Sequence, residues 1–453
     1  MFEPSQARRG PAPAGPFGVP GGVPAGVPVG AAAVQSWTSA LLSVSRALDD
    51  GERIDLLRAL EELTCAAAGA QVMVTADFDA SQRAEQAAQG VPVARQGRGV
   101  ASQVALARRE SPFRGRQHLG MAKVLPTEMP HTLTALRAGL ITEDRAKVLL
   151  QETACLTLEN RITIDRAIAG DPEALSDYSD KQLIADVHRL AYKLEPGSVI
   201  DRRAKAEADR RVTLRPAPDV MSQLSALLPV TQGVAVFAAL SKEADRLRAA
   251  GDGRSRGQLM ADLLVTRVTG AAPVTPGGPP VVPVAINLVV SDQTLLGGSD
   301  DPAHVDGFGQ IPADLARQLA HDTLDAGLKV WLRRLYASPD GRLVAMDSRA
   351  RLFPKLLAKL MIFRDRVCRT KWCGAPIRHL DHALDHDQGG PTSARNGQGL
   401  CEMCNHAKEA PNWRAGPSPH GPPEDQAIVT TTPTGHSYVS RPPRAPTPYD
   451  GAA

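Results

Sequence analysis

The chain has 453 residues, of which 43% are hydrophobic and 22% are charged, and its formal net charge is +3. At roughly 100–200 residues per domain, this length allows two to four domains with real hydrophobic cores. The net charge is too small to make the whole molecule a polyanion binder, so any contact with nucleic acid requires a local basic patch. No signal peptide and no stretch of roughly 18 unbroken apolar residues is present, which predicts a cytoplasmic protein without membrane association.

The predicted elements are mostly helices. Residues 1–34 are rich in Gly, Pro and Ala and are expected to be disordered. Beyond them we predict a helical domain in which Thr142, followed by two acidic residues, starts one helix. Ser179, with Gln182 three residues later, has the capping-box spacing and starts another. The predicted fold class is mainly α with a small α+β part.

Later segments divide the rest of the chain. A short strand is predicted at 212–215 and a long helix at 219–250, and a strand-like alternation near 284–290 precedes a helix at 312–336. The predicted organisation is a disordered N-terminus (1–34), a helical domain (35–270), a Pro/Gly linker (271–283), a connecting strand and helix region (284–339), a small C-terminal module (340–415) and a disordered Pro-rich tail (416–453).

Four of the six cysteines lie in one short window of the C-terminal module. Cys368 and Cys373 have C-x4-C spacing, and Cys401 and Cys404 have C-x2-C spacing. Zinc takes four such soft ligands in tetrahedral geometry, and two short loops from distant chain positions can supply them. We therefore predict a structural Zn²⁺ that joins the two ends of the module. The isolated Cys65 and Cys155 are expected to be small buried hydrophobic residues.

The same window contains an acidic residue next to a histidine. Asp381 and His382 lie in a predicted strand at 377–383, where adjacent side chains point to opposite sides. One of them can hold a metal ion while the other addresses a water molecule beside it. A metal ion that stabilises charge on a phosphate, with an imidazole that accepts a proton from water, suits hydrolysis of a phosphodiester.

With these residues in place, the segment resembles the HNH endonuclease family, whose site is a ββα-metal unit. Asp381-His382 match its first-strand pair, and Asn396 matches the loop asparagine that braces the loop carrying the catalytic histidine. The family's third element follows the second cysteine of the C-x2-C pair. Asn405 occupies that position and is the first choice of metal ligand, with the adjacent His406 as its rival.

The upstream chain is also similar to a known arrangement. Its order of a helical N-terminal region, DRRAKAEADRR at 201–211, GFGQIPADLARQLA at 307–320 and FRDRVCRTKWC at 363–373 resembles actinobacterial proteins. Those proteins join a domain of unknown function to a C-terminal HNH module. This second similarity implies no function for the helical domain.

The resemblance implies a metal-dependent DNA endonuclease. His382 would act as general base, with Asn396 in the catalytic unit, and Asp381 with Asn405 or His406 would hold Mg²⁺ or Mn²⁺. Residues 351–415 carry 11 Lys and Arg against 6 Asp and Glu, so positive charge is concentrated near the candidate site. The expected DNA contacts are Arg366, Arg369, Lys371, Arg378, His386 and Lys408.

An alternative function remains open, namely a non-catalytic zinc module for DNA binding or regulation. It would need the four cysteines and the basic residues but no competent metal site beside His382. The sequence does not define protein partners, an oligomeric state or a DNA target.

Overall fold

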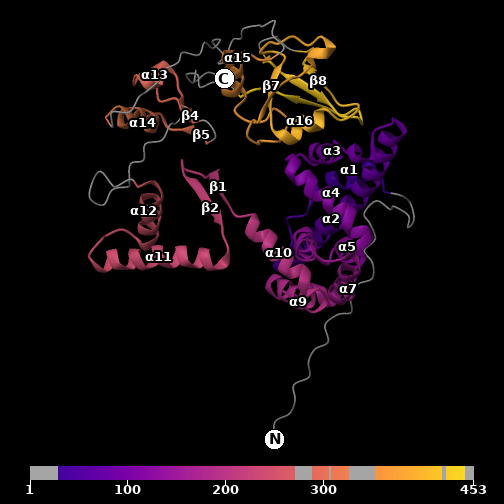
Figure 1. The fold of residues 1–453 in the computed structure, drawn as a ribbon. Helices are drawn as coiled ribbons and strands as arrows, with labels where there is room; N and C mark the ends of the chain where they lie inside the picture. Colours follow the sequence, from indigo (N-terminus) through magenta and orange to yellow (C-terminus); the bar gives the residue numbers. More distant parts are fainter. Residues whose placement is uncertain (1–28, 271–287, 306–307, 326–351, 421–424, 444–453) are drawn as a thin grey trace. The chain divides into compact units, whose positions relative to one another are not determined.

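The computed structural model describes residues 29–270, 288–305, 308–325, 352–420 and 425–443 (Figure 1). Most described residues are helical, and the strands form four small sheets of two or three strands each. This confirms the predicted predominance of helix. The predicted linker at 271–283 and most of the expected disordered N-terminus lie outside the described residues. Compact units cover residues 1–61 and 62–453.

The unit that comprises residues 1–61 contains two short elements and the first part of a long helix. Helix α1 covers Ala31–Ala40, the 3-10 helix η1 covers Leu41–Ser43, and α2 covers Asp50–Ala88. Residues 31–34 are therefore helical, and the expectation that regular structure is missing up to residue 34 is wrong there. Three alanines and one valine open α1, and such residues tolerate a helix once the Gly/Pro-rich stretch has ended.

A helical bundle forms the first part of the unit 62–453. Its core contains Met121, Leu125, Leu136, Ile164 and Leu183, each at most 2% exposed. Cys65 is buried in this core, as predicted, whereas Cys155 is only partly buried and packs against it. Besides α2, the bundle is built from η2 (Val93–Arg95), α3 (Val100–Arg108), α4 (Pro112–Glu128), α5 (Pro130–Arg137), α6 (Glu143–Glu152), α7 (Leu158–Ala169), α8 (Pro172–Ser176), α9 (Asp180–Leu194) and α10 (Pro196–Ala208).

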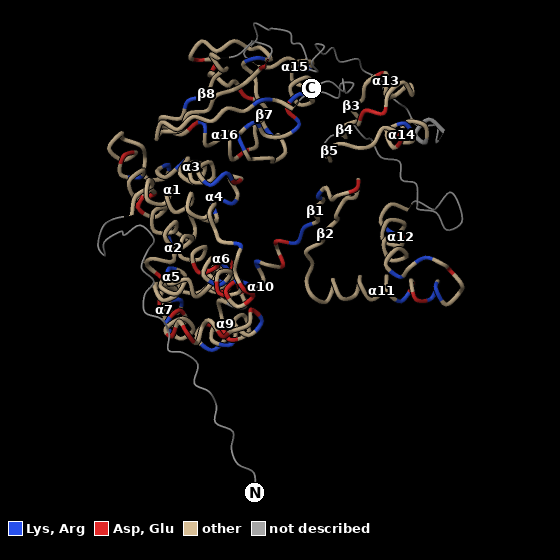
Figure 2. The backbone as a smooth tube through the Cα atoms, turned by 180° about the vertical axis from the view of Figure 1, so that it is seen from behind, with Lys and Arg blue, Asp and Glu red and all other residues tan. Residues whose placement is uncertain are grey.

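Side-chain caps fix where several of these helices begin. The Thr142 hydroxyl accepts a hydrogen bond from Arg145 N at the start of α6, and Ser179 and Gln182 form a reciprocal capping box at the start of α9. Both predicted starts are confirmed. On α9 and α10, Lys and Arg alternate with Asp and Glu (Figure 2). Within the described residues, no helix is both long and apolar enough to cross a membrane.

A hairpin and a helix pair follow α10. Strands β1 (Arg211–Pro216) and β2 (Ser222–Leu227) pair antiparallel, and the helices α11 (Val230–Ala249) and α12 (Arg256–Thr269) contact each other. The predicted strand at 212–215 is confirmed. The predicted helix at 219–250 is wrong in its first third, because residues 222–227 complete the hairpin and the helix begins only at Val230.

A three-stranded sheet and two helices come next along the chain. The sheet order is β3-β4-β5, from β3 (Leu288–Val289), β4 (Ala303–Val305) and β5 (Gly309–Ile311). The helices are α13 (Asp292–Leu295) and α14 (Ala313–Asp325). Strand β3 and helix α14 agree with the strand and helix expected in the region 284–339, of which residues 284–287, 306–307 and 326–339 are not described.

The C-terminal part contains helices, an antiparallel strand pair and a second small sheet. Its elements are α15 (Lys355–Asp365), β6 (His379–His382), η3 (His386–Gln388), β7 (Gly397–Leu400), α16 (Glu402–Lys408), β8 (Arg414–Pro417), β9 (Ile428–Thr431) and β10 (Ser437–Ser440). Strands β8, β9 and β10 form a sheet in the order β10-β9-β8. The prediction of a disordered tail after residue 415 is therefore wrong for these three strands.

Candidate metal centre

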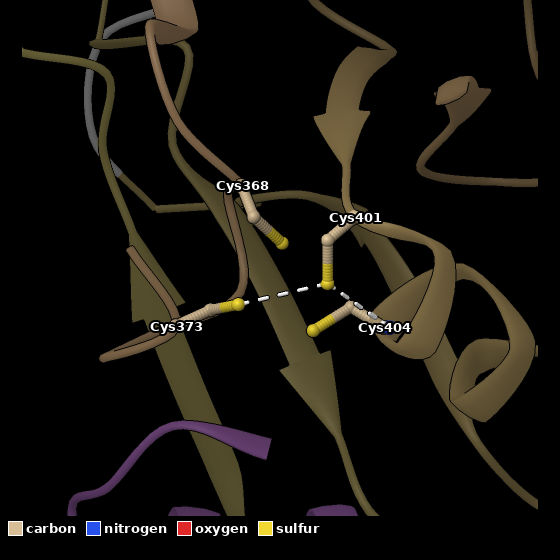
Figure 3. A group of neighbouring side chains, drawn as sticks. All are labelled: Cys368, Cys373, Cys401 and Cys404. Atoms are coloured by element: carbon tan, nitrogen blue, oxygen red, sulfur yellow. Dashed lines mark hydrogen bonds between the residues drawn. The ribbon is translucent and has the colours of Figure 1, made fainter. Parts of the chain in front are cut away.

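The four clustered cysteines meet at one point. Cys368 and Cys373 lie in the loop after α15, whereas Cys401 and Cys404 lie at the start of α16, and their sulfurs point toward one another (Figure 3). All four Sγ atoms lie within 4.8 Å of one another, all four residues are buried, and none forms a disulfide. Tetrahedral Zn²⁺ with Zn–S bonds of about 2.3 Å places sulfurs about 3.8 Å apart. The Sγ atoms of Cys373 and Cys401 are 3.7 Å apart, so this cluster could hold a zinc ion.

Because the four thiols are packed closely together, their pKa values differ. Hydrogen bonds with Cys368 and then with Cys373 hold the pKa of the Cys401 thiol well below its usual range. Hydrogen bonds with the same neighbours raise the pKa of Cys404, and a hydrogen bond with Cys368 raises that of Cys373. Four thiolates cannot share so small a space without a cation to offset their repulsion. A metal ion with two positive charges supplies that compensation.

A buried ion network supports the loop that carries Cys368. The Asp365 carboxylate is fully buried and accepts hydrogen bonds from Arg364, from Arg369 and from the backbone N–H of Gly399 on β7. Arg364 also donates to Gln426, and Arg369 donates to the backbone carbonyls of Gln426 and Ser440. This network joins α15 and β7 to the C-terminal sheet.

Strand β6 presents the acidic residue and the histidine predicted as a pair. His382 is half-buried; its ring stacks on Phe353 with centroids 4.4 Å apart, and its Nε2 lies 2.9 Å from the Thr392 hydroxyl. In the described part of the chain, His382 Nδ1 has no hydrogen-bond partner. Burial lowers the pKa of His382, against an opposing effect of Asp381. The lowered pKa favours the neutral imidazole, and the Thr392 hydroxyl holds its Nε2.

Asn396 braces the loop between β6 and β7. It is 1% exposed; its Oδ1 accepts a hydrogen bond from Leu384 N, and its Nδ2 donates to the carbonyls of Leu384 and Pro391. Gly390 lies against the same groups, since a Cβ there would be 1.9 Å from Leu384 O. These contacts hold the loop that follows His382.

Lys408 on α16 reaches back to β6. Its ammonium lies 2.8 Å from Asp381 Oδ2 and 2.6 Å from His382 O, and it also contacts Asp385 Oδ1. Burial would lower the pKa of Lys408, but hydrogen bonds to Asp381 and Asp385 outweigh burial and raise it. The ammonium is thus a fixed positive charge next to Asp381.

The two candidates for the metal ligand on α16, Asn405 and His406, differ in their surroundings. Asn405 Oδ1 is buried and has no hydrogen-bond partner in the described structure, whereas His406 is exposed on α16. A buried amide oxygen without a partner costs free energy unless an ion or a water molecule satisfies it. The surroundings therefore favour Asn405 as the ligand, and its oxygen is of the type that Mg²⁺ and Mn²⁺ prefer.

The residues predicted to contact DNA differ in their exposure to solvent. Lys371, Arg378 and His386 are exposed. Arg366 is half-buried, and burial lowers its pKa. Arg369 is 4% exposed and its guanidinium is fully engaged in the Asp365 network, so its assignment as a DNA contact is wrong.

Sequence reasoning missed several contributors to this site. Phe353 and Thr392 hold the His382 ring, and Asp385 completes the oxygen set around Lys408. Asp365 anchors the whole network from a position next to the first cysteine loop. Asp365, Asp385 and Thr392 lie within about ten residues of the motif, which does not separate them from their neighbours, and Phe353 lies farther from it and carried no signal.

Comparison with known proteins identifies most of the chain. A family model described as "Domain of unknown function (DUF222)" matches residues 55–365, which is more than half of the chain. The chain belongs to the DUF222 family. The expected N-terminal domain of unknown function is thereby confirmed. The DUF222 match ends at Asp365, before the first clustered cysteine. No curated protein and no solved structure matches the chain.

Proposed function

We propose that the segment after the DUF222 match is an HNH-type, metal-dependent DNA endonuclease module. The observation that carries the proposal is the pairing on β6 of Asp381 with His382, whose ring is oriented by Thr392 and whose pKa is lowered. The buried Asn405 Oδ1 on α16, which has no partner among the described residues, supports it. The two strands β6 and β7 followed by α16 have the element order of a ββα-metal unit. Asp381 and His382 lie on β6 and Asn405 lies on α16, so this unit contains the residues predicted to act together.

Asp381 and Asn405 would hold a divalent ion such as Mg²⁺ or Mn²⁺. Both offer hard oxygen atoms, and the orphaned Oδ1 of Asn405 is consistent with an ion that satisfies it. Such an ion supplies positive charge to a bound phosphate and to the departing 3′ oxygen. His406 is the less suitable ligand because it faces solvent.

His382 would accept the proton of the attacking water. Thr392 fixes Nε2 and Phe353 fixes the ring plane, which leaves Nδ1 as the accepting atom. The lowered pKa keeps this nitrogen unprotonated at neutral pH, as a general base requires. Asn396 would contribute by keeping the loop after His382 in place rather than by contacting substrate.

The four cysteines would hold a structural Zn²⁺ that takes no part in the reaction. All four ligand positions are filled by thiols, and closed sites of this kind are structural rather than catalytic. The exposed side chains of Lys371, Arg378 and His386 would contact DNA phosphates and position the backbone.

A plasmid assay separates this proposal from a non-catalytic zinc module. Supercoiled plasmid is incubated with the purified chain and Mg²⁺ or Mn²⁺, with and without chelator, and the relaxed and linear forms are quantified. We expect metal-dependent nicking by the wild type and at least about a hundredfold loss in Asp381→Ala. A chain that shifts DNA in a gel but never cuts it with either metal would favour the binding module.

A further inference from the structure

We propose that the Lys408 ammonium is a tethered counter-cation that competes with the divalent ion for Asp381 and so sets the metal affinity of the site. This inference rests on the proposed function, because it concerns the same metal site. It begins from the oxygen atoms around the ammonium, which come from Asp381, Asp385 and the His382 backbone carbonyl.

The ammonium is enclosed and fully engaged. The Lys408 side chain is 11% exposed and the Asp381 side chain 22% exposed, and a lysine has three N–H donors for the three oxygens present. No donor remains for a DNA phosphate while this arrangement holds. The expected role of Lys408 as a phosphate contact therefore applies only after its ammonium has been released.

The oxygen set is also what a hard divalent cation requires. Carboxylate and backbone carbonyl oxygens are the ligand types of Mg²⁺ and Mn²⁺. Asn405, whose Oδ1 has no partner in the described structure, precedes Lys408 by three positions on α16 and so shares its face of the helix. The chain's own cation thus lies beside the place proposed for the metal ion.

This arrangement determines the net charge around Asp381 and the access of a divalent ion to its carboxylate. Asp381 and Asp385 carry two negative charges, and Lys408 offsets one of them. An ion that binds Asp381 must displace or repel the ammonium, so the affinity for metal is lower than the two carboxylates alone would give. Removal of the ammonium is expected to strengthen divalent-ion binding, which is the opposite of what loss of a supporting side chain does.

The test measures Mn²⁺ binding to the full, zinc-loaded chain from the electron paramagnetic resonance signal of free Mn²⁺. We expect Lys408→Met to tighten Mn²⁺ binding by about tenfold or more. Lys359→Met, which removes an exposed lysine of α15, is the matched control and is expected to change affinity by less than about twofold. Asp381→Asn should abolish the binding in both the wild-type and the Lys408→Met backgrounds. Equal or weaker Mn²⁺ binding by Lys408→Met would overturn the inference.

A second measurement needs no variant at Lys408. Acetylation of lysines by acetic anhydride is followed by mass spectrometry, with and without saturating Mn²⁺. Release of the ammonium predicts faster acetylation of Lys408 when Mn²⁺ is bound, and no change at Lys359; an unchanged rate at Lys408 would contradict the proposal.

The failure of this inference can be distinguished from the failure of the proposed function. If the wild type binds Mn²⁺ through Asp381 but never cuts DNA, the nuclease proposal is wrong and the inference on Lys408 is unaffected. If the wild type does not bind Mn²⁺ through Asp381, both proposals are wrong.

Discussion

Neighbouring side chains on α16 have opposite environments. Asn405 presents a buried oxygen that has no hydrogen-bond partner among the described residues, and His406 faces solvent. We therefore predict that Asn405→Ala weakens Mn²⁺ binding by at least about tenfold, because a ligand oxygen is lost, whereas His406→Ala changes it by less than about twofold. Calorimetric titration of both variants measures this. The reverse order of effects would make His406 the ligand.

A second residue-scale prediction concerns acid stability of the helical bundle. Hydrogen bonding to His118, with charges of Lys147, His118 and Arg108, lowers the pKa of Glu143 to about 2 against the opposing effect of burial. A depressed carboxyl pKa stabilises the fold above the unfolded value of about 4.5, and that stability is lost as pH falls toward 2.

Between pH 6 and pH 3 the wild type should lose about 1–2 kcal/mol of unfolding free energy through Glu143, after a discount for its partial exposure. Denaturant unfolding at both pH values, compared with Glu143→Gln, measures it. The variant should already be less stable at pH 6, and its difference from the wild type should shrink by that amount at pH 3. A constant difference at both pH values would refute the assignment.

At the scale of residues, the sequence predicted the features that depend on residues close together in the chain. The two cysteine pairs were recognisable because each pair lies within one loop or turn, and the structure brings the pairs together. The role of Arg369 was wrong because charge in a sequence does not indicate burial, and its carboxylate partner Asp365 was not singled out. Thr392 and Phe353 were missed because their contacts with His382 arise only from the tertiary fold.

At the scale of elements, the Asp365 network connects α15, β7 and the C-terminal sheet. Removal of one partner from a buried ion network leaves an uncompensated charge and costs roughly 3–5 kcal/mol. We predict that Asp365→Asn destabilises the cysteine-containing part by about that amount, measured by denaturant unfolding. Asp387→Asn, at an exposed carboxylate, serves as control and should change stability by less than about 0.5 kcal/mol. Equal stability of the two variants would contradict this role.

Elements were predictable where local signals dominate. The caps at Thr142 and Ser179 act within one turn, and both helix starts were confirmed. Strand β2 was missed because residues 222–227 become a strand only by pairing with β1. Strands β9 and β10 were missed because each is a short run within a Pro-rich tail, and they become strands only by pairing with each other and with β8.

At the scale of the whole molecule, the bundle core and the cysteine cluster are separate hydrophobic clusters. We predict one zinc ion per chain, lost in Cys401→Ser together with the cooperative unfolding of the C-terminal part, since zinc binding contributes directly to folding of small modules. The helical bundle should keep its circular dichroism signal and its own transition. Cys155→Ser, at an isolated cysteine, is the control and should retain the zinc. Zinc content unchanged in Cys401→Ser would end the claim.

The central claim is that His382 activates water for DNA hydrolysis. Its most direct test is the single-turnover rate of plasmid nicking at saturating Mn²⁺ for His382→Ala and for His379→Ala, which changes an exposed histidine of the same strand. The account predicts a rate at least about a hundredfold below wild type for His382→Ala and a rate within about threefold of wild type for His379→Ala. Similar rates for both variants and wild type would contradict it.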